Sequence, residues 1–424
     1  MGSRRDFIKN SAGLGAAFAF SGISAISNPA RKEINLPKFN ENNEEDYWKI
    51  ISGFFPIVPQ LKYFNTGTMG PSPYPVIDFV NHKLFEIDSK LNYGGWENCI
   101  SSIANFVGAS ENEIALTHNV TEGINILARG INFKKGEEII LSNHEHAGNA
   151  VPWLAVAKEY GLKIKILNLD LNPNDLLINL KKIISPKTRV FAVPHIPCTI
   201  GLVLPIKEIS DFCRKNNILT CIDGAHGPGM LNLNLHDLGC DFYASCFHKW
   251  VLGPKGTGFL YVRKESLNFL KPVFVGAGSD TGWDLLGNEP ALKEWVDSAK
   301  RFFYGSQNSA LFNGVTKAIE FHEKIGKERI AQRCAKLTDY FYYELSKYPD
   351  KFELLGSPDN QFRAGITAFR HKQIPAEKLN QLLATAGFKI RVIAENNLNA
   401  NRVSTHIFNT FDDINLLVKS LINC

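Results

Sequence analysis

The sequence predicts an α/β protein with a large domain built on a doubly wound, mainly parallel sheet and a smaller α+β domain at the C-terminus. The chain has 424 residues, more than a single small hydrophobic core organises. Between residues 113 and 262, short apolar runs alternate with helical patterns, as in successive βαβ units. After Pro349 this strict alternation ends, which indicates the second domain.

Each element of the large domain is expected from its own pattern. Residues 46–55 have the spacing of a short amphipathic helix, and a short strand then enters a Gly/Pro-rich loop at 63–73, followed by a helix at 75–91. That loop is interpreted either as the wall of a site, because glycine lets the backbone approach a ligand, or as a simple connection. Further strands are expected at 113–117, 138–141, 163–167, 189–194, 219–222, 242–245 and 258–262, and helices at 124–131, 151–160, 174–184 and 206–216.

The second domain is expected to follow a long loop at 265–300 and one long connecting helix at 309–346. Its strands are expected at 352–355, 365–370 and 402–404, and its helices at 376–386 and 410–421.

The N-terminus departs from the globular pattern. Residues 3–9 read Ser-Arg-Arg-Asp-Phe-Ile-Lys and precede a weakly apolar Gly/Ala-rich stretch. This resembles a twin-arginine export signal, which implies the twin-arginine translocation machinery as a partner and a periplasmic or exported location. A disordered tail is the alternative, and the protein is then cytoplasmic. We therefore divide the chain into a signal segment (1–27), a linker and N-terminal segment (28–60), the large domain (61–308), and the connecting helix with the small domain (309–424).

Charge and cysteine content exclude several classes of function. The net charge of +5 is small and the lysines are dispersed, so nucleic acid is not a favoured partner. The eight cysteines form no CxxC pair, so the sequence indicates neither a zinc site nor a disulfide framework, and we expect no metal.

One lysine stands out for its surroundings. Lys249 lies between His248 and Trp250, ahead of a Gly/Pro turn. A desolvated lysine loses part of its ammonium character and can form a Schiff base with an aldehyde cofactor. A solvated loop lysine is the alternative. Asp223 ends an expected strand, at the sheet edge where open parallel sheets bind ligands.

Two other strand ends carry polar groups. Residues 119–123 form a polar turn that opens a helix, which suits a phosphate, although an ordinary N-cap by Thr121 has the same geometry. His144 and His146 follow the next strand, but their i, i+2 spacing and lack of partners argue against a metal. A ring stacked on an aromatic cofactor and a solvated loop histidine remain the two readings of His146.

Taken together, five ordered blocks resemble the pyridoxal-phosphate-dependent aminotransferase class V family, of fold type I, over about residues 60–424. The blocks lie at 119–125 (Asn-Val-Thr-Glu-Gly-Ile-Asn), 145–153 (Glu-His and Pro-Trp), 223–226 (Asp-Gly-Ala-His), 245–262 (beginning Ser-Cys-Phe-His-Lys-Trp) and 402–410 (beginning Arg-Val-Ser).

The resemblance implies pyridoxal 5′-phosphate as cofactor and assigns the catalytic residues. Lys249 holds the cofactor as a Schiff base and then carries protons at the substrate's α-carbon. Asp223 pairs with the protonated pyridine nitrogen, His146 stacks on the ring, and His226 reaches its phenolic oxygen.

The same resemblance implies how the phosphate and the substrate are bound. The phosphate is held by Val120 and Thr121, by Ser245 or Cys246, by His248, and by Ser306 from the partner protomer, which implies a homodimer with shared active sites. The substrate is a small molecule, an amino acid, whose carboxylate is clamped by Arg402, with Arg391 as a second clamp.

Two departures bear on the reaction. Residues 392–397 hold no cysteine, whereas the family's cysteine desulfurases carry one there, so the sequence disfavours desulfurase activity. Cys198 stands where many members have an asparagine, and its Pro-Cys-Thr-x-Gly setting resembles the isopenicillin-N-epimerase-like branch. We expect an epimerase or racemase, with a class V transaminase as the alternative, followed by a lyase or a catalytically inactive protein. A nucleotide-binding Rossmann enzyme is disfavoured because GxGxxG is missing after the first strand.

Overall fold

The computed structural model describes residues 34–169 and 175–424, and the compact unit considered below is Leu36–Cys424. The predicted twin-arginine signal falls in residues 1–27, outside the described part of the chain. Within the described residues, none of the helices combines the length and the apolarity needed to span a bilayer.

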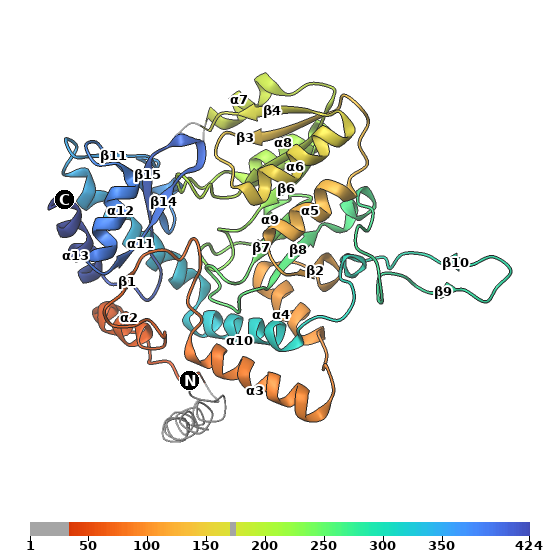
Figure 1. Ribbon diagram of the computed structural model, residues 1–424, viewed down its shortest axis with the longest axis horizontal. Helices are drawn as coiled ribbons and strands as arrows, with labels where there is room; N and C mark the ends of the chain where they lie inside the picture. Colours follow the sequence, from red (N-terminus) through yellow and green to blue (C-terminus); the bar gives the residue numbers. More distant parts are fainter. Residues whose placement is uncertain (1–33, 170–174) are drawn as a thin grey trace, which may run out of the picture. The chain divides into compact units, whose positions relative to one another are not determined.

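A seven-stranded sheet forms the centre of the fold (Figure 1). Its strand order is β2-β8-β7-β6-β5-β3-β4, and every pair is parallel except the two that involve β8. The predicted doubly wound, mainly parallel sheet is therefore confirmed. The strands are β2 (Ile114–Thr117), β3 (Glu138–Ser142), β4 (Lys163–Leu167), β5 (Thr188–Pro194), β6 (Leu219–Asp223), β7 (Phe242–Cys246) and β8 (Gly258–Val262).

Helices cover both faces of this sheet, because successive strand residues point to opposite sides. In β8, Phe259 and Tyr261 join one core cluster, while Leu260 and Val262 join the other. The first cluster also takes in α4 (Glu97–Val107), α7 (Leu176–Ile183), α8 (Ile206–Lys215) and α10 (Ser309–Ile325); the second takes in α5 (Val120–Gly130) and α6 (Ala147–Tyr160). The remaining helices of this part are α2 (Glu44–Ser52), α3 (Tyr74–Lys90) and α9 (Leu235–Leu238).

A second, antiparallel sheet has the order β11-β12-β15-β14. Apolar residues of three helices pack on it and close a separate core. β1 (Lys62–Tyr63) pairs with β13 (Phe388–Lys389), so an N-terminal segment contributes to this part of the fold. The elements are β11 (Phe352–Leu354), β12 (Ile366–His371), β14 (Arg391–Ile393), β15 (Ala400–Ser404), α11 (Lys327–Ser346), α12 (Ala376–Thr385) and α13 (Phe411–Ile422).

The structure corrects several predicted elements. The single helix expected at 309–346 is two helices, α10 and α11, because Gly326 has φ 100° and cannot continue an α-helix. α4 and β14 were not predicted. Neither was the hairpin of β9 (Trp283–Asp284) and β10 (Ala291–Leu292), which projects from the long loop in Figure 1. α5 and α6 begin four residues earlier than expected, since their polar first turns belong to the helices.

Candidate active site

A cavity of about 280 Å³ lies at the carboxyl ends of the parallel strands. It is lined by the segments that follow β2, β3, β5, β6 and β7, together with residues of the second sheet and of the Gly/Pro-rich loop. All predicted site residues line it except Ser245 and Ser306: they are Val120, Thr121, His146, Cys198, Asp223, His226, Cys246, His248, Lys249, Arg391 and Arg402.

Lys249 and His226 meet inside this cavity. The lysine Nζ lies 3.5 Å from His226 Nε2, and Trp250 donates its indole N–H to His226 Nδ1 at 2.9 Å. Burial holds the pKa of His226 well below its ordinary value, so the ring is neutral, and its proton is on Nε2 because Nδ1 accepts. Trp250 therefore fixes the histidine that faces the lysine, which gives the aromatic neighbour a specific task.

Asp223 ends β6 with its carboxylate buried beside the cavity. The Ala225 N–H donates to its Oδ1 at 2.9 Å. Burial raises the pKa of Asp223, while the nearby Lys249 charge opposes that shift. A buried carboxylate in this position is stabilised by a cation in the cavity, so its chemistry fits a protonated pyridine nitrogen.

His146 is the N-cap of α6, and its Nδ1 accepts the Gly148 N–H at 3.0 Å. Burial, assisted by the Lys249 charge, lowers the pKa of His146, so this ring is neutral as well. A Cβ on Gly148 would lie 2.7 Å from Thr121 Oγ1, so the glycine keeps open the gap between the histidine and the start of α5.

The first turn of α5 provides an anion cradle on the same edge. Its first backbone N–H groups have no intrahelical acceptor, and Val120 and Thr121 face the cavity. Asn119 caps the helix by accepting the Glu122 N–H at 2.9 Å. His248 adds a buried Nδ1 that has no partner within the described chain, and burial together with Lys249 lowers its pKa to about 4. A phosphate fits this set of donors.

Two predicted phosphate ligands, Ser245 and Ser306, are not among the residues that line this cavity. Ser245 faces away from the cavity and donates its Oγ to Gly224 O at 2.8 Å, because Ser245 and Cys246 alternate across the strand. Of the two alternatives, the structure thus places Cys246 at the site. Ser306 is exposed and does not line the cavity of its own chain. Its role across a dimer interface stays a prediction.

Arg402 provides a buried positive charge in the wall of the cavity. Its Nη2 donates to Asn65 Oδ1 at 3.0 Å and to Thr68 Oγ1 at 2.8 Å. Burial lowers its pKa to about 10, so it remains charged at neutral pH. Among the described residues, no ion pair includes Arg402, and its Nε is unpaired. A buried guanidinium of this kind fits a carboxylate brought in by a substrate.

The Gly/Pro-rich loop at 63–73 is a wall of the site rather than a plain connection. Gly67 and Thr68 line the cavity. Gly70 donates its N–H to His248 O at 2.8 Å, and a Cβ on Gly70 would lie 2.0 Å from Lys249 O. The loop therefore packs directly on the lysine segment.

Sequence reasoning missed the residues that support the predicted ones. Asn65 and Thr68 orient Arg402, and the only sequence feature that pointed to them was the Gly/Pro-rich composition of their loop. Glu395 forms an ion pair with Arg391, and its signal was the i, i+4 spacing of opposite charges.

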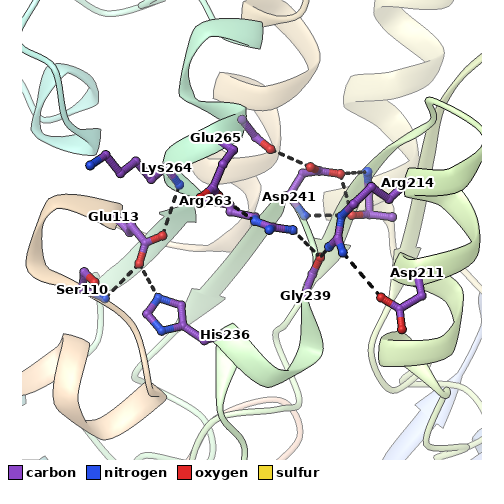
Figure 2. Close-up of polar contacts among 12 residues, drawn as sticks. Ser110, Glu113, Asp211, Arg214, His236, Gly239, Asp241, Arg263, Lys264 and Glu265 are labelled. Atoms are coloured by element: carbon purple, nitrogen blue, oxygen red, sulfur yellow. Dashed lines mark hydrogen bonds and ion pairs between the residues drawn. The ribbon is translucent and has the colours of Figure 1, made fainter.

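The opposite edge of the sheet carries a different kind of polar cluster (Figure 2). Glu113 accepts the backbone N–H of Ser110 at 2.9 Å and of Lys264 at 3.1 Å, and it contacts His236 Nε2 at 2.6 Å. Asp241 accepts from Thr220 N, Thr220 Oγ1 and Ser266 Oγ at 2.8, 2.9 and 2.6 Å. Both carboxylates are hydrogen-bonded by donors of the protein itself, so we infer that this cluster stabilises the sheet rather than binding a ligand.

The chain is similar to known proteins over most of its length. The family model for class-V aminotransferases matches residues 89–417. A probable cysteine desulfurase from Methanothermobacter thermautotrophicus is 28% identical over 393 residues, covering 86% of this chain and 95% of that protein. The isopenicillin N epimerase of Streptomyces clavuligerus is 29% identical over 347 residues, covering 76% and 84%.

Solved structures with the same fold include a cystine C–S lyase, C-DES, in complex with its product cysteine persulfide. It is 26% identical, with a TM-score of 0.80, and the match covers 87% of this chain and 98% of that one. A C-DES mutant with glycine covalently linked to its pyridoxal-phosphate cofactor is 25% identical, with a TM-score of 0.80 and coverages of 87% and 98%.

Proposed function

Because the chain belongs to the class-V aminotransferase family, we propose that it acts at the α-carbon of an amino acid and that the outcome is epimerisation or racemisation. The observation that carries the amino-acid part is the pairing of Lys249 with Arg402 in one cavity: an amine that can bond an aldehyde faces a buried guanidinium that has no counter-ion in the described chain. In an α-amino acid, the amine and the carboxylate are carried by the same α-carbon, so one molecule presents both groups that these two side chains bind.

Pyridoxal 5′-phosphate is the cofactor, and the residues present fit it. The first turn of α5 and His248 would hold the phosphate, Asp223 the pyridine nitrogen, and His146 and His226 the ring. When bound, it supplies an aldehyde for Lys249 and a ring that takes up electron density from the substrate's α-carbon.

The protein's own groups then have separate tasks. Arg402 orients the substrate carboxylate, and Lys249 accepts the α-proton. Inversion then requires that a proton return to the opposite face of the α-carbon. The neutral His226 donates from Nε2 without adding positive charge next to the lysine. Trp250 keeps that histidine in place, so removing the indole N–H would loosen the orientation of the donor.

The cysteines support epimerisation over sulfur transfer, although several relatives are named as desulfurases. Cys198 and Cys246 are the cysteines of the described chain that line the cavity, and both are buried. Burial raises the pKa of the Cys198 thiol, and it raises that of Cys246 to about 11. Thiols in this state are poor nucleophiles, so neither suits the acceptance of sulfur from a substrate.

Elimination of a sulfur leaving group is the second candidate. It is favoured by the similarity to the cystine C–S lyase, which shares the fold at a TM-score of 0.80. Such a reaction needs the same α-proton removal by Lys249 and differs only in the bond that breaks next.

One experiment separates these outcomes. The purified holoenzyme should be yellow, absorbing at about 420 nm, and borohydride should fix the cofactor on Lys249. It is incubated in D₂O with single enantiomers of α-amino acids, and both α-deuteration and configuration are followed by NMR and chiral chromatography. Inversion without a keto acid supports epimerisation. Exchange that depends on a keto acid indicates transamination, and release of sulfide or persulfide from cysteine or cystine indicates the lyase. A colourless protein that exchanges no α-proton contradicts the whole proposal.

We also propose that the protein is exported by the twin-arginine route and works as a homodimer. Replacing Arg4 and Arg5 by lysine should leave the protein in the cytoplasm, as checked by cell fractionation, and a periplasmic Lys-Lys variant would contradict export by this route. Light scattering of the holoenzyme checks the dimer, and mixing the inactive variants Lys249→Ala and Ser306→Trp should restore some activity if the sites are shared.

A further inference from the structure

Two arginines stand side by side in the wall of the cavity. Arg391 on β14 is the direct cross-strand partner of Arg402 on β15, and both side chains line the cavity. Like charges directly opposite each other on a sheet repel. The pair would therefore form a strongly cationic wall unless one of the charges were neutralised.

The structure treats the two guanidiniums differently. Arg391 forms an ion pair with Glu395, four residues further along, and its Nη1 lies 3.7 Å from Cys198 Sγ. The hydrogen bonds that Arg402 makes within the described chain go to neutral oxygens, those of Asn65, Thr68 and the Cys198 carbonyl. One positive charge thus remains for the substrate.

Glu395 is held in place by a strained turn. It begins the 3₁₀ turn Glu395–Asn397, in which Asn396 and Asn397 both have φ 55°, a left-handed conformation that asparagine tolerates better than most residues. The Asn396 amide also donates to Asn143 O, on the loop that leads to His146. The turn is therefore tied to the loop that precedes His146, which indicates a defined position for the carboxylate.

The second oxygen of this carboxylate is left over. Glu395 Oε1 contacts Arg391, whereas Oε2 is buried and has no hydrogen-bond partner within the described part of the chain. Burial alone would raise the pKa of Glu395, but the contact with Arg391 outweighs it, and the net pKa is lowered. Glu395 is therefore ionised, and it acts on the cavity through Arg391, because Arg391 is among the described residues that line the cavity and Glu395 is not.

We propose that Glu395 is a specificity-determining residue that cancels the charge of Arg391, so that the site takes amino acids with one carboxylate and an uncharged side chain. The inference rests on the proposed action on amino acids. A side-chain carboxylate next to Arg391 would face Glu395 at short range in a poorly solvated site, and like-charge contact there is costly. An uncharged side chain, such as an amide, meets no such repulsion.

The test compares substrates that differ only in this group. Glutamine is paired with glutamate and asparagine with aspartate, for wild type and for Glu395→Gln, which keeps the size of the side chain and removes its charge. Dissociation constants are read from the absorbance of the bound cofactor, and kcat and KM from α-proton exchange in D₂O. Wild type should prefer the amides by about tenfold or more, and Glu395→Gln should reduce or invert that ratio by about tenfold, chiefly through tighter binding of the dicarboxylates.

A matched control removes the same charge elsewhere. Glu353 pairs with Arg370 across β11 and β12, and neither residue lines the cavity, so Glu353→Gln should leave the amide-to-carboxylate ratio unchanged. If amino acids bind but Glu395→Gln leaves the ratio where it is in wild type, the role of Glu395 is refuted while the proposed function stands. If no amino acid of either kind perturbs the cofactor or exchanges its α-proton, the proposed function fails and this inference fails with it.

Discussion

Replacement of Arg402 by lysine tests how the site reads the substrate carboxylate. Lysine keeps the positive charge but cannot present two parallel N–H donors to a carboxylate. The variant should therefore lose about one charge-assisted hydrogen bond, worth about 1.5–3 kcal/mol. Since each 1.4 kcal/mol is a factor of ten in binding, affinity for the amino acid should fall by about 10- to 150-fold.

The structure favours lysine over alanine for this test. Alanine would leave Asn65 Oδ1 and Thr68 Oγ1 without the donor they share, and the loop next to Lys249 could shift. A lysine amine can still donate to one of these oxygens. The change is then confined largely to the group that meets the substrate.

The assay measures the dissociation constant of an amino acid and of the amine that lacks its carboxylate, each from the absorbance of the bound cofactor. The amine has nothing for Arg402 to clamp, so its affinity should change by less than about twofold. Equal cofactor loading of wild type and variant, read from the absorbance after release in alkali, serves as the control. If both ligands weaken equally, or if neither does, Arg402 does not bind the carboxylate.

The remaining predictions concern the loop, the buried histidines and the far edge of the sheet. Gly70→Ala places a Cβ 2.0 Å from Lys249 O, so it should lower the free energy of unfolding in urea by at least about 1–3 kcal/mol and should also weaken cofactor binding. In Gly276→Ala the nearest atom would be 3.8 Å from the new Cβ, so neither stability nor cofactor binding should change. Equal effects of the two substitutions would contradict the packing described. Burial lowers the pKa values of His195 and His406 to about 4, so unfolding takes up protons between pH 6.5 and 4. The stability contributed by these neutral rings is complete above pH 6.5, and the free energy of unfolding should fall by about 1.4 kcal/mol per pH unit for each ring as the pH drops. A free energy of unfolding that stays constant between pH 6.5 and 5 would contradict this. Asp241→Ala leaves the donors of Thr220 and Ser266 without their acceptor and should lower the free energy of unfolding by about 1–3 kcal/mol. The KM should stay unchanged, and a shifted KM would contradict the purely structural role of Asp241.

The sequence predicted the sheet and the cofactor side of the site because both depend on local patterns. Apolar runs located the strands, and the polar residues that follow them, such as Thr121, Asp223 and Lys249, were expected to gather because carboxyl ends of parallel strands share an edge. Elements with weak patterns were missed. β14 has only three residues, and the break at Gly326 interrupts a tract whose helical spacing continues on both sides.

The substrate side was harder to predict because its contacts are made between distant segments. Arg402 depends on Asn65 and Thr68, more than 300 positions away, and no periodicity links them. Arg391 was expected at the site as a second clamp, but the pairing of its charge could not be predicted, because that depends on where a short turn directs Glu395. The sequence left Ser245 and Cys246 as alternatives for a related reason: the register of a strand decides which of two neighbours faces the cavity.

The two edges of the central sheet separate function from stability by the way their polar groups are partnered. At the carboxyl edge, Arg402 Nε and His248 Nδ1 are buried without partners in the described chain, and such groups cost stability unless a ligand satisfies them. At the opposite edge, Glu113 and Asp241 each accept from several donors of the protein itself (Figure 2). Cofactor binding should therefore stabilise the protein by satisfying groups at the carboxyl ends of the strands. The increase that the cofactor causes in the free energy of unfolding should persist in Asp241→Ala but should be smaller in variants that lack His248 or Arg402. Comparing apo and holo unfolding in the two kinds of variant measures this separation directly.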